Sequence, residues 1–244
     1  IRENLSESHN VFGEDNEERA EWVEDMPDAP DDGYIKERAD IIYFTGCVAS
    51  FFPLAQRIPM DLVKIFDVAH VDFTLLGEDE WCCGFPLLGA GLTGQLDDLI
   101  ANNVDTIKAR GGKQVVFACP SCYRMWQEHY PREFEIFHAT EFLARLLKQD
   151  RLPLRELDLT VTYHDPCDLG RTSGIYEAPR QIIRAIPGIE FTEMLEHGEN
   201  ALCCGGGGDR GDGVGVVSGV PAVDTDPAST GDCVGVYGVD RGGG

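Results

Sequence analysis

The chain has 244 residues, of which 43% are hydrophobic, so it is long enough to bury one large core or two smaller ones. Its 43 Asp and Glu residues outnumber 20 Lys and Arg residues, and the net charge of −23 excludes nucleic acid as a partner because phosphates would be repelled. No apolar run approaches the roughly 18 residues that a membrane-spanning helix needs. We therefore expect a cytoplasmic protein, which would reach the inner face of a membrane only through a partner.

The first 39 residues are strongly acidic and are interrupted by Pro27, Pro30 and Gly33, which predicts a solvated lead-in. From Asp40 onward, short β-rich runs alternate with segments of helical period, a pattern typical of an α/β fold with parallel sheets. The predicted strands are 41–44, 71–75, 115–118, 135–137 and 159–164, and the predicted helices are 60–69, 94–109, 140–148 and 177–185.

Two halves of the chain repeat the same layout. The segment Ile42–Cys47 matches Thr162–Cys167 at an offset of 120 residues, and Cys82-Cys83-Gly84 matches Cys203-Cys204-Gly205 at an offset of 121. Two offsets that agree within one residue indicate a duplication. We therefore divide the chain into a lead-in (1–39), a first cysteine-rich domain (40–150), an incomplete second one (151–208) and a tail (209–244).

The tail contains ten Gly and eight Val but no Leu, Ile, Phe, Glu or Lys. This composition cannot build an amphipathic helix, and it predicts either a flexible linker or sequence that is not native to the gene. The tail also occupies the place where a second copy of Cys119-Pro120-Ser121-Cys122 is expected, and only Cys233 lies nearby.

Five of the nine cysteines lie in the first half: Cys47, Cys82, Cys83, Cys119 and Cys122. Cys47 and Cys119 directly follow predicted strands, and the adjacent pair follows a third. Because the carboxyl ends of parallel strands meet at one edge of the sheet, these thiols are expected to converge there.

Adjacent cysteines are unusual ligands for a single tetrahedral ion, because zinc sites favour spacings of two to four residues. A cluster of several irons offers a separate corner to each thiol, and five thiols exceed what one zinc ion or a regular cubane requires. Iron–sulfur binding is therefore the leading interpretation. Zinc binding stays open, and Cys119-Pro120-Ser121-Cys122 taken alone also fits a redox-active dithiol.

These motifs resemble the duplicated cysteine-rich CCG domain of heterodisulfide reductases and of related iron–sulfur subunits of anaerobic glycerol-3-phosphate dehydrogenase and glycolate oxidase. The resemblance covers about residues 40–208. It rests on the first-half cysteines together with His164-Asp165-Pro166-Cys167 and Cys203-Cys204-Gly205-Gly206-Gly207. Val11-Phe12-Gly13 and Glu21-Trp22 also resemble the linker that follows a ferredoxin-like domain in this family, which implies such a domain upstream.

The resemblance implies that Cys47, Cys82, Cys83, Cys119 and Cys122 bind a non-cubane [4Fe-4S] cluster, or zinc in some members. It implies further metal ligands at Cys167, Cys203 and Cys204, although three thiolates without the final Cys-X-X-Cys form an incomplete set. The expected function is that of an oxidoreductase subunit that passes electrons from a dehydrogenase or ferredoxin-like partner to a disulfide or a quinone-linked acceptor. The alternative is a zinc-stabilised assembly module without redox activity.

Three other features receive structural interpretations. Gly89-Ala90-Gly91-Leu92-Thr93-Gly94 fits a dinucleotide-binding fingerprint, but Cys82-Cys83-Gly84-Phe85-Pro86 precedes it where a strand is required, so we expect a glycine turn. His164 and His138 are expected at strand ends in supporting roles. Arg171 is expected to meet an anionic group or the acidic surface, and we assign no catalytic residue.

Overall fold

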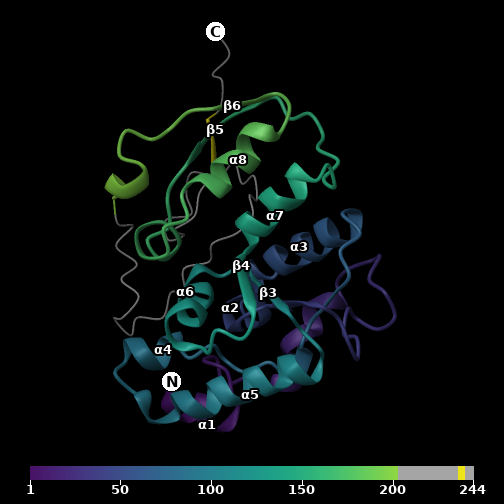
Figure 1. The fold of residues 1–244 in the computed structure, drawn as a ribbon, viewed down its shortest axis with the longest axis vertical. Helices are drawn as coiled ribbons and strands as arrows, with labels where there is room; N and C mark the ends of the chain where they lie inside the picture. The colour runs from purple at the N-terminus through teal and green to yellow at the C-terminus, as the bar shows by residue number, and fades with distance from the viewer. Residues whose placement is uncertain (203–235, 240–244) are drawn as a thin grey trace.

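The computed structural model describes residues 1–202 and 236–239, and its first half contains a four-stranded parallel sheet (Figure 1). The strands are β1 (Ile41–Phe44), β2 (Phe73–Thr74), β3 (Gln114–Phe117) and β4 (Glu135–His138), in the order β2-β1-β3-β4. This order confirms the predicted α/β class. The chain leaves β1 toward one side of the sheet and β3 toward the other, so the junction between β1 and β3 is a topological switch point.

Alternating side chains of the central strands face two separate helical layers. Tyr43 and Val116 pack with helices α3 (Arg57–Val68) and α7 (Ala139–Lys148) on one face. Phe44 and Phe117, with the other alternate residues of these strands, pack with α5 (Leu96–Ala109) and α6 (Pro120–His129) on the opposite face. Because helices cover both faces of the sheet, the sequences of the central strands are continuous apolar runs.

The predicted helices agree with α3, α5, α7 and α8 (Glu177–Ala185) within a few residues. Helix α6 was not predicted, and neither were the short helices and helical turns that precede it. The short helices are α1 (Arg2–Glu7), η1 (Asn16–Val23), α2 (Cys47–Phe51) and α4 (Phe85–Gly89). The helical turns are η2 (Pro53–Ala55), η3 (Gly77–Asp79) and η4 (Thr93–Gln95). None of the helices in the described ranges is long and apolar enough to cross a membrane.

The second half forms a smaller sheet with the order β6-β5-β7. Strand β5 (Leu159–Tyr163) is parallel to β6 (Ile189–Phe191) and antiparallel to β7 (Val236–Val239). The second sheet is therefore mixed, and β7 lies inside the segment for which a flexible linker or non-native sequence was expected. The remaining tail residues, 209–235 and 240–244, lie outside the described part of the chain.

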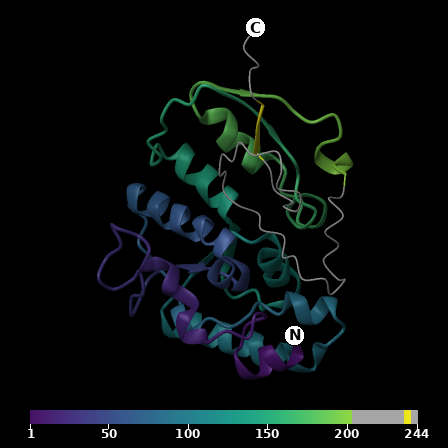
Figure 2. The ribbon, with the colours of Figure 1, turned by 180° about the vertical axis from the view of Figure 1, so that it is seen from behind.

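The lead-in is not the solvated segment that its acidity predicts. Trp22 is 1% exposed and Tyr34 is 3% exposed, and both belong to the core built on α3 and α7. In Figure 2 the purple N-terminal segment lies against the first half along much of its length. A few large apolar residues are sufficient to hold the segment against the first domain. The many acidic side chains between them hide these residues from an analysis of composition.

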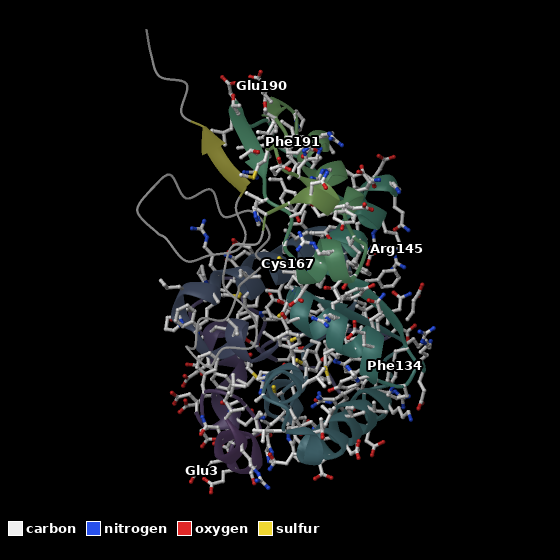
Figure 3. The ribbon with its side chains drawn as sticks, turned by 90° about the vertical axis from the view of Figure 1, so that its left-hand side faces the viewer. Glu3, Phe134, Arg145, Cys167, Glu190 and Phe191 are labelled. Atoms are coloured by element: carbon white, nitrogen blue, oxygen red, sulfur yellow. The ribbon has the colours of Figure 1, made fainter. Side chains whose placement is uncertain are left out.

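The two halves meet beside the cysteine-bearing helix α6. The π-helical turn η5 (Asp168–Thr172) packs against α6, and Leu169 inserts into the same apolar cluster as Trp126. Asp168 accepts hydrogen bonds from Ser121 and from Arg124, at 2.5 and 3.2 Å. Figure 3 shows Cys167, at the start of this turn, near the junction of the two halves.

His138 is predicted to stabilise the fold by capping α7. Its side chain accepts from the backbone N–H of Thr140, and Nε2 lies 3.0 Å from the carbonyl oxygen of Ala118. Replacing His138 with Ala should lower the free energy of unfolding by about 2–3 kcal/mol, with a smaller loss for Asn, which can still cap a helix. Urea denaturation of the two variants and the wild type measures this difference.

The same residue makes a pH-dependent contribution with a defined sign. Burial lowers the pKa of His138 from 6.5 to about 4, so below pH 6.5 the unfolded chain takes up a proton that the folded chain excludes. The stability advantage of the wild type over His138→Asn should therefore shrink as the pH falls from 6.5 toward 4. An advantage that stays constant across this window would contradict the buried neutral imidazole.

Candidate metal centre

Cys47 and Cys119 both lie at the switch point of the parallel sheet. Phe44, the last residue of β1, pairs with Phe117, the last residue of β3, so the two strands end side by side. Cys47 begins α2 and Cys119 is the N-cap residue of α6. The predicted convergence of these two cysteines at the carboxyl edge is therefore confirmed.

The adjacent pair Cys82-Cys83 reaches this edge through the loop that follows β2 and η3. Gly84 follows the pair with φ at +94°, a left-handed conformation that glycine adopts without strain, and it begins the short helix α4. Its N–H donates to Cys82 Sγ at 3.5 Å. The Tyr130 hydroxyl donates to the Cys83 carbonyl, and Asn103 donates to the Cys82 carbonyl, which fixes the backbone of the pair.

Side-chain hydrogen bonds join the five thiols into a chain in the order Cys47, Cys82, Cys83, Cys122, Cys119. Cys47, Cys82, Cys83 and Cys122 are buried, and Cys119 is partly exposed. Residues separated by up to 75 positions in sequence thus place their sulfur atoms in one continuous row, which is the arrangement on which the sequence interpretation depends.

Hydrogen bonding within this row moves the pKa values of its thiols in opposite directions. The hydrogen bond that Cys122 donates to Cys83 is the main cause that lowers the pKa of Cys83 to about 6. The hydrogen bond from Cys122 is also the main cause that lowers the pKa of Cys119. The bond to Cys119 raises the pKa of Cys122, and the bond to Cys82 raises that of Cys47. The bond from Cys47 acts to lower the pKa of Cys82, but the bond to Cys83 and burial raise it. The row thus combines thiolate and thiol character.

A glycine makes room for the row beside α2. Gly46 has φ at +80°, and a Cβ atom at this position would lie 3.1 Å from Cys122 Sγ and 4.0 Å from Cys119 Cβ. A side chain here would occupy the space next to both sulfur-bearing residues. The close approach of the Gly46 backbone is therefore a property of the site.

A buried phenol without a partner also lies near the row. The Tyr43 hydroxyl is fully buried and has no hydrogen-bond partner within residues 1–202 and 236–239. Burial, with contributions from Glu80, Cys119 and Cys122, raises the pKa of Tyr43, so the group keeps its proton. A buried donor of this kind normally has an acceptor, and the sulfur of a bound cluster would provide one.

The donor set fits a centre of several metal atoms better than a single ion. The five thiols are hydrogen-bonded in pairs along the row, so each can serve a different corner of a cluster. Thiolates are also the ligands that iron–sulfur clusters select.

Two residues of the site were missed at the sequence level. Arg19, from the lead-in, places Nη2 3.8 Å and Nη1 4.0 Å from Cys47 Sγ. Its Nη1 also lies 3.0 Å from Glu80 Oε1, and both side chains are 1% exposed. Buried ion pairs of this kind leave no periodic signal in a sequence, because the partners are 61 positions apart.

The second half contributes one described thiol. Cys167 is partly exposed at the start of η5, and Cys203 and Cys204 lie outside the described residues. His164 Nε2 lies 2.9 Å from the Leu202 carbonyl oxygen, and Arg171 donates to the Ala201 carbonyl at 2.6 Å. Both side chains thus hold the segment that leads to the second Cys-Cys pair. This is the supporting role expected for His164, whereas Arg171, which was expected to meet an anionic group or the acidic surface, donates to a neutral carbonyl.

The glycine-rich segment 89–94 is a turn between helices. It begins at Gly89, the last residue of α4, and ends inside η4. Because α4 stands where a dinucleotide fold requires a strand, the segment lacks the context of a dinucleotide-binding loop.

The fold and the row of thiols define a cysteine-rich α/β protein, and comparison with known families agrees. The model of the cysteine-rich CCG domain matches residues 41–127 and again residues 161–217. The chain therefore belongs to the CCG cysteine-rich domain family. No solved structure matches the chain.

Several curated relatives are similar over most of the chain. A subunit of the dihydromethanophenazine:CoB–CoM heterodisulfide reductase of Methanosarcina mazei is 39% identical over 228 residues, 89% of this chain and 52% of that protein. The EtfAB:quinone oxidoreductase of Syntrophomonas wolfei is 32% identical over 85% of the chain and 30% of its own length. The "probable iron-sulfur-binding oxidoreductase FadF" of Bacillus subtilis is 32% identical over 82% of the chain and 30% of its own length. The chain thus spans about half or less of these relatives.

Replacing Gly46 with Ala should disrupt the site by crowding. Strain at positive φ costs about 1–2 kcal/mol, and the new methyl group would also displace Cys122 Sγ. Gly91→Ala is the matched control, because Gly91 has φ at +70° but nothing within 4 Å of its Cβ position. We expect both variants to lose stability in thermal denaturation and only Gly46→Ala to lose bound metal in elemental analysis. Equal metal content in the two would contradict the crowding.

Proposed function

We propose that the chain is the iron–sulfur portion of an oxidoreductase and that its first domain transfers single electrons. The observation that carries this proposal is the row of five thiols at the switch point of the sheet. The names of the relatives, which include a heterodisulfide reductase subunit and a quinone oxidoreductase, support the same class of reaction. Catalysis of a complete reaction is proposed for an assembly with partner subunits.

The ligands in this proposal are Cys47, Cys82, Cys83, Cys119 and Cys122, which would hold a non-cubane [4Fe-4S] cluster. When bound, such a cluster supplies reversible one-electron chemistry at a potential that ligation, hydrogen bonds to sulfur and burial determine. The protein keeps the sulfur atoms of four cysteines away from solvent, and Gly84 donates an N–H to Cys82 Sγ. Tyr43 offers a further buried O–H on the side of Cys119 and Cys122.

We assign a lesser metal-binding role to Cys167, Cys203 and Cys204. Three thiolates form an incomplete ligand set, which would bind metal weakly or exchange it. The first domain is therefore the proposed electron-transfer site, and the second supports it through the packing of η5 against α6.

The proposed route begins at a dehydrogenase or ferredoxin-like partner and ends at a disulfide or a quinone-linked acceptor. Each transfer moves one electron, so reduction of a disulfide to two thiols requires two transfers and two protons. In this scheme the chain provides an insulated relay. A location in the cytoplasm, with membrane contact through a partner, is part of the same proposal.

Metal analysis after anaerobic purification tests the proposal. We expect brown protein with about four irons and four sulfides per chain and an electron paramagnetic resonance signal that changes on reduction. Colourless protein with one zinc would support the assembly module instead, and dithiol activity that survives complete metal removal would support a thiol reductase.

Cys82→Ser and Cys83→Ser should each abolish cluster binding, because each sulfur is assigned to its own iron. Cys233→Ser makes the same chemical change outside the proposed ligand set and is the matched control. Iron and sulfide analysis of the three variants measures the outcome. Full iron content in either Cys82→Ser or Cys83→Ser would refute separate ligation by the adjacent pair.

A further inference from the structure

The lead-in supplies polar contacts to one end of the thiol row. The carbonyl oxygen of His9 accepts from the Cys82 backbone N–H at 2.8 Å, and the Val11 N–H donates to the Cys47 sulfur. The Arg19 guanidinium approaches the same sulfur at 3.8 and 4.0 Å. All three residues precede position 41, where the family match begins, so they lie outside the matched domain.

The position of Arg19 is fixed from several directions. Asn16 Oδ1 accepts from Nε and Nη2 at 3.1 and 2.9 Å, and Glu80 Oε1 accepts from Nη1 at 3.0 Å. The guanidinium carbon also lies 5.2 Å from the centre of the Phe51 ring. Its geometry toward Cys47 is therefore determined before any cluster binds.

Glu80 balances the charge of Arg19 in the buried site. Its carboxylate accepts from the backbone N–H groups of Thr45 and Gly46, both at 2.8 Å, in addition to the guanidinium. Since every one of these contacts offers a donor to the carboxylate, Glu80 fits its place as the negative partner of Arg19, whose guanidinium also faces the Cys47 sulfur.

We infer that Arg19 is a positioning residue that orients the Cys47 ligand and sets the reduction potential of the cluster, an inference that rests on the proposed function. A cation next to a thiolate ligand stabilises the reduced centre, which carries one more negative charge, and so raises the potential. The carboxylate of Glu80 acts in the opposite direction. The potential thus depends on an ion pair that crosses from the lead-in to the first domain.

A second buried arginine–carboxylate pair makes different contacts. In the second half, Arg180 binds Asp165 with two hydrogen bonds, at 2.6 and 2.7 Å, and Asp165 also accepts from the Gly198 N–H at 2.6 Å. That guanidinium uses both terminal nitrogens on carboxylates. Arg19 donates to one carboxylate through Nη1 and to Asn16 through Nη2, and both of these nitrogens also lie within 4.0 Å of Cys47 Sγ, a contact that a link to Glu80 alone does not require.

Potentiometric titration of the loaded chain, followed by electron paramagnetic resonance, tests the inference. Arg19→Met should lower the midpoint potential, and Glu80→Gln should raise it, because the two changes remove opposite charges. Arg19→Lys keeps the charge but loses the planar fork, so its potential should lie between those of Arg19→Met and the wild type. Iron release to a chelator should accelerate about 10-fold in Arg19→Met, the usual scale for losing a residue that orients a ligand.

Arg110→Lys is the control, because Arg110 donates to Asp79 and to the Lys36 carbonyl and has no recorded hydrogen bond to a described cysteine. Its potential should equal that of the wild type. Shifts of the same sign in Arg19→Met and Glu80→Gln, or no shift in either, would overturn the inference. If Arg19→Met does not fold, an unchanged potential in Glu80→Gln is sufficient to overturn it. Wild-type chain that binds no iron would instead refute the proposed function.

Discussion

The rest of the structure depends on the delivery of five thiols to one edge of a parallel sheet. Strand β1 ends beside β3, and the chain turns into α2 at Cys47 and into α6 at Cys119. The loop after β2 then brings Cys82-Cys83 between them. A parallel sheet suits this task, because each strand releases its chain at the same edge. Gly46 leaves room for Cys122 Sγ, and Gly84 donates its N–H to Cys82 Sγ.

Burial of so much sulfur creates an electrostatic problem that the surrounding residues answer. A cluster with thiolate ligands is anionic, and carboxylates on the surface already give the chain a net charge of −23. Arg19 places a positive charge next to Cys47, and Glu80 makes its burial tolerable. In both halves, a buried arginine–carboxylate pair thus fixes the loop before the Cys-Cys motif, through Glu80 in the first and through Asp165 and Gly198 in the second.

Much of the fold was predictable because its strands and long helices carry strong local patterns. The Ile41–Phe44 strand and the α5 and α8 helices agree with prediction, and the meeting of the cysteines followed from their positions after the strands of a parallel sheet. The lead-in was misjudged, because Trp22 and Tyr34 are isolated among acidic residues and show no period. Helix α6 was missed because the polar residues among its apolar ones obscure the helical period in its sequence. Arg19 could not be predicted, because its role depends on contacts between distant segments.

X-ray absorption spectroscopy at the iron edge of anaerobically prepared protein tests the central claim most directly. If the row of thiols surrounds one polynuclear centre, the spectrum should contain a sulfur shell together with an iron–iron shell from neighbouring metal atoms. A sulfur shell without any iron–iron scattering, or absorption only at the zinc edge, would contradict the shared centre.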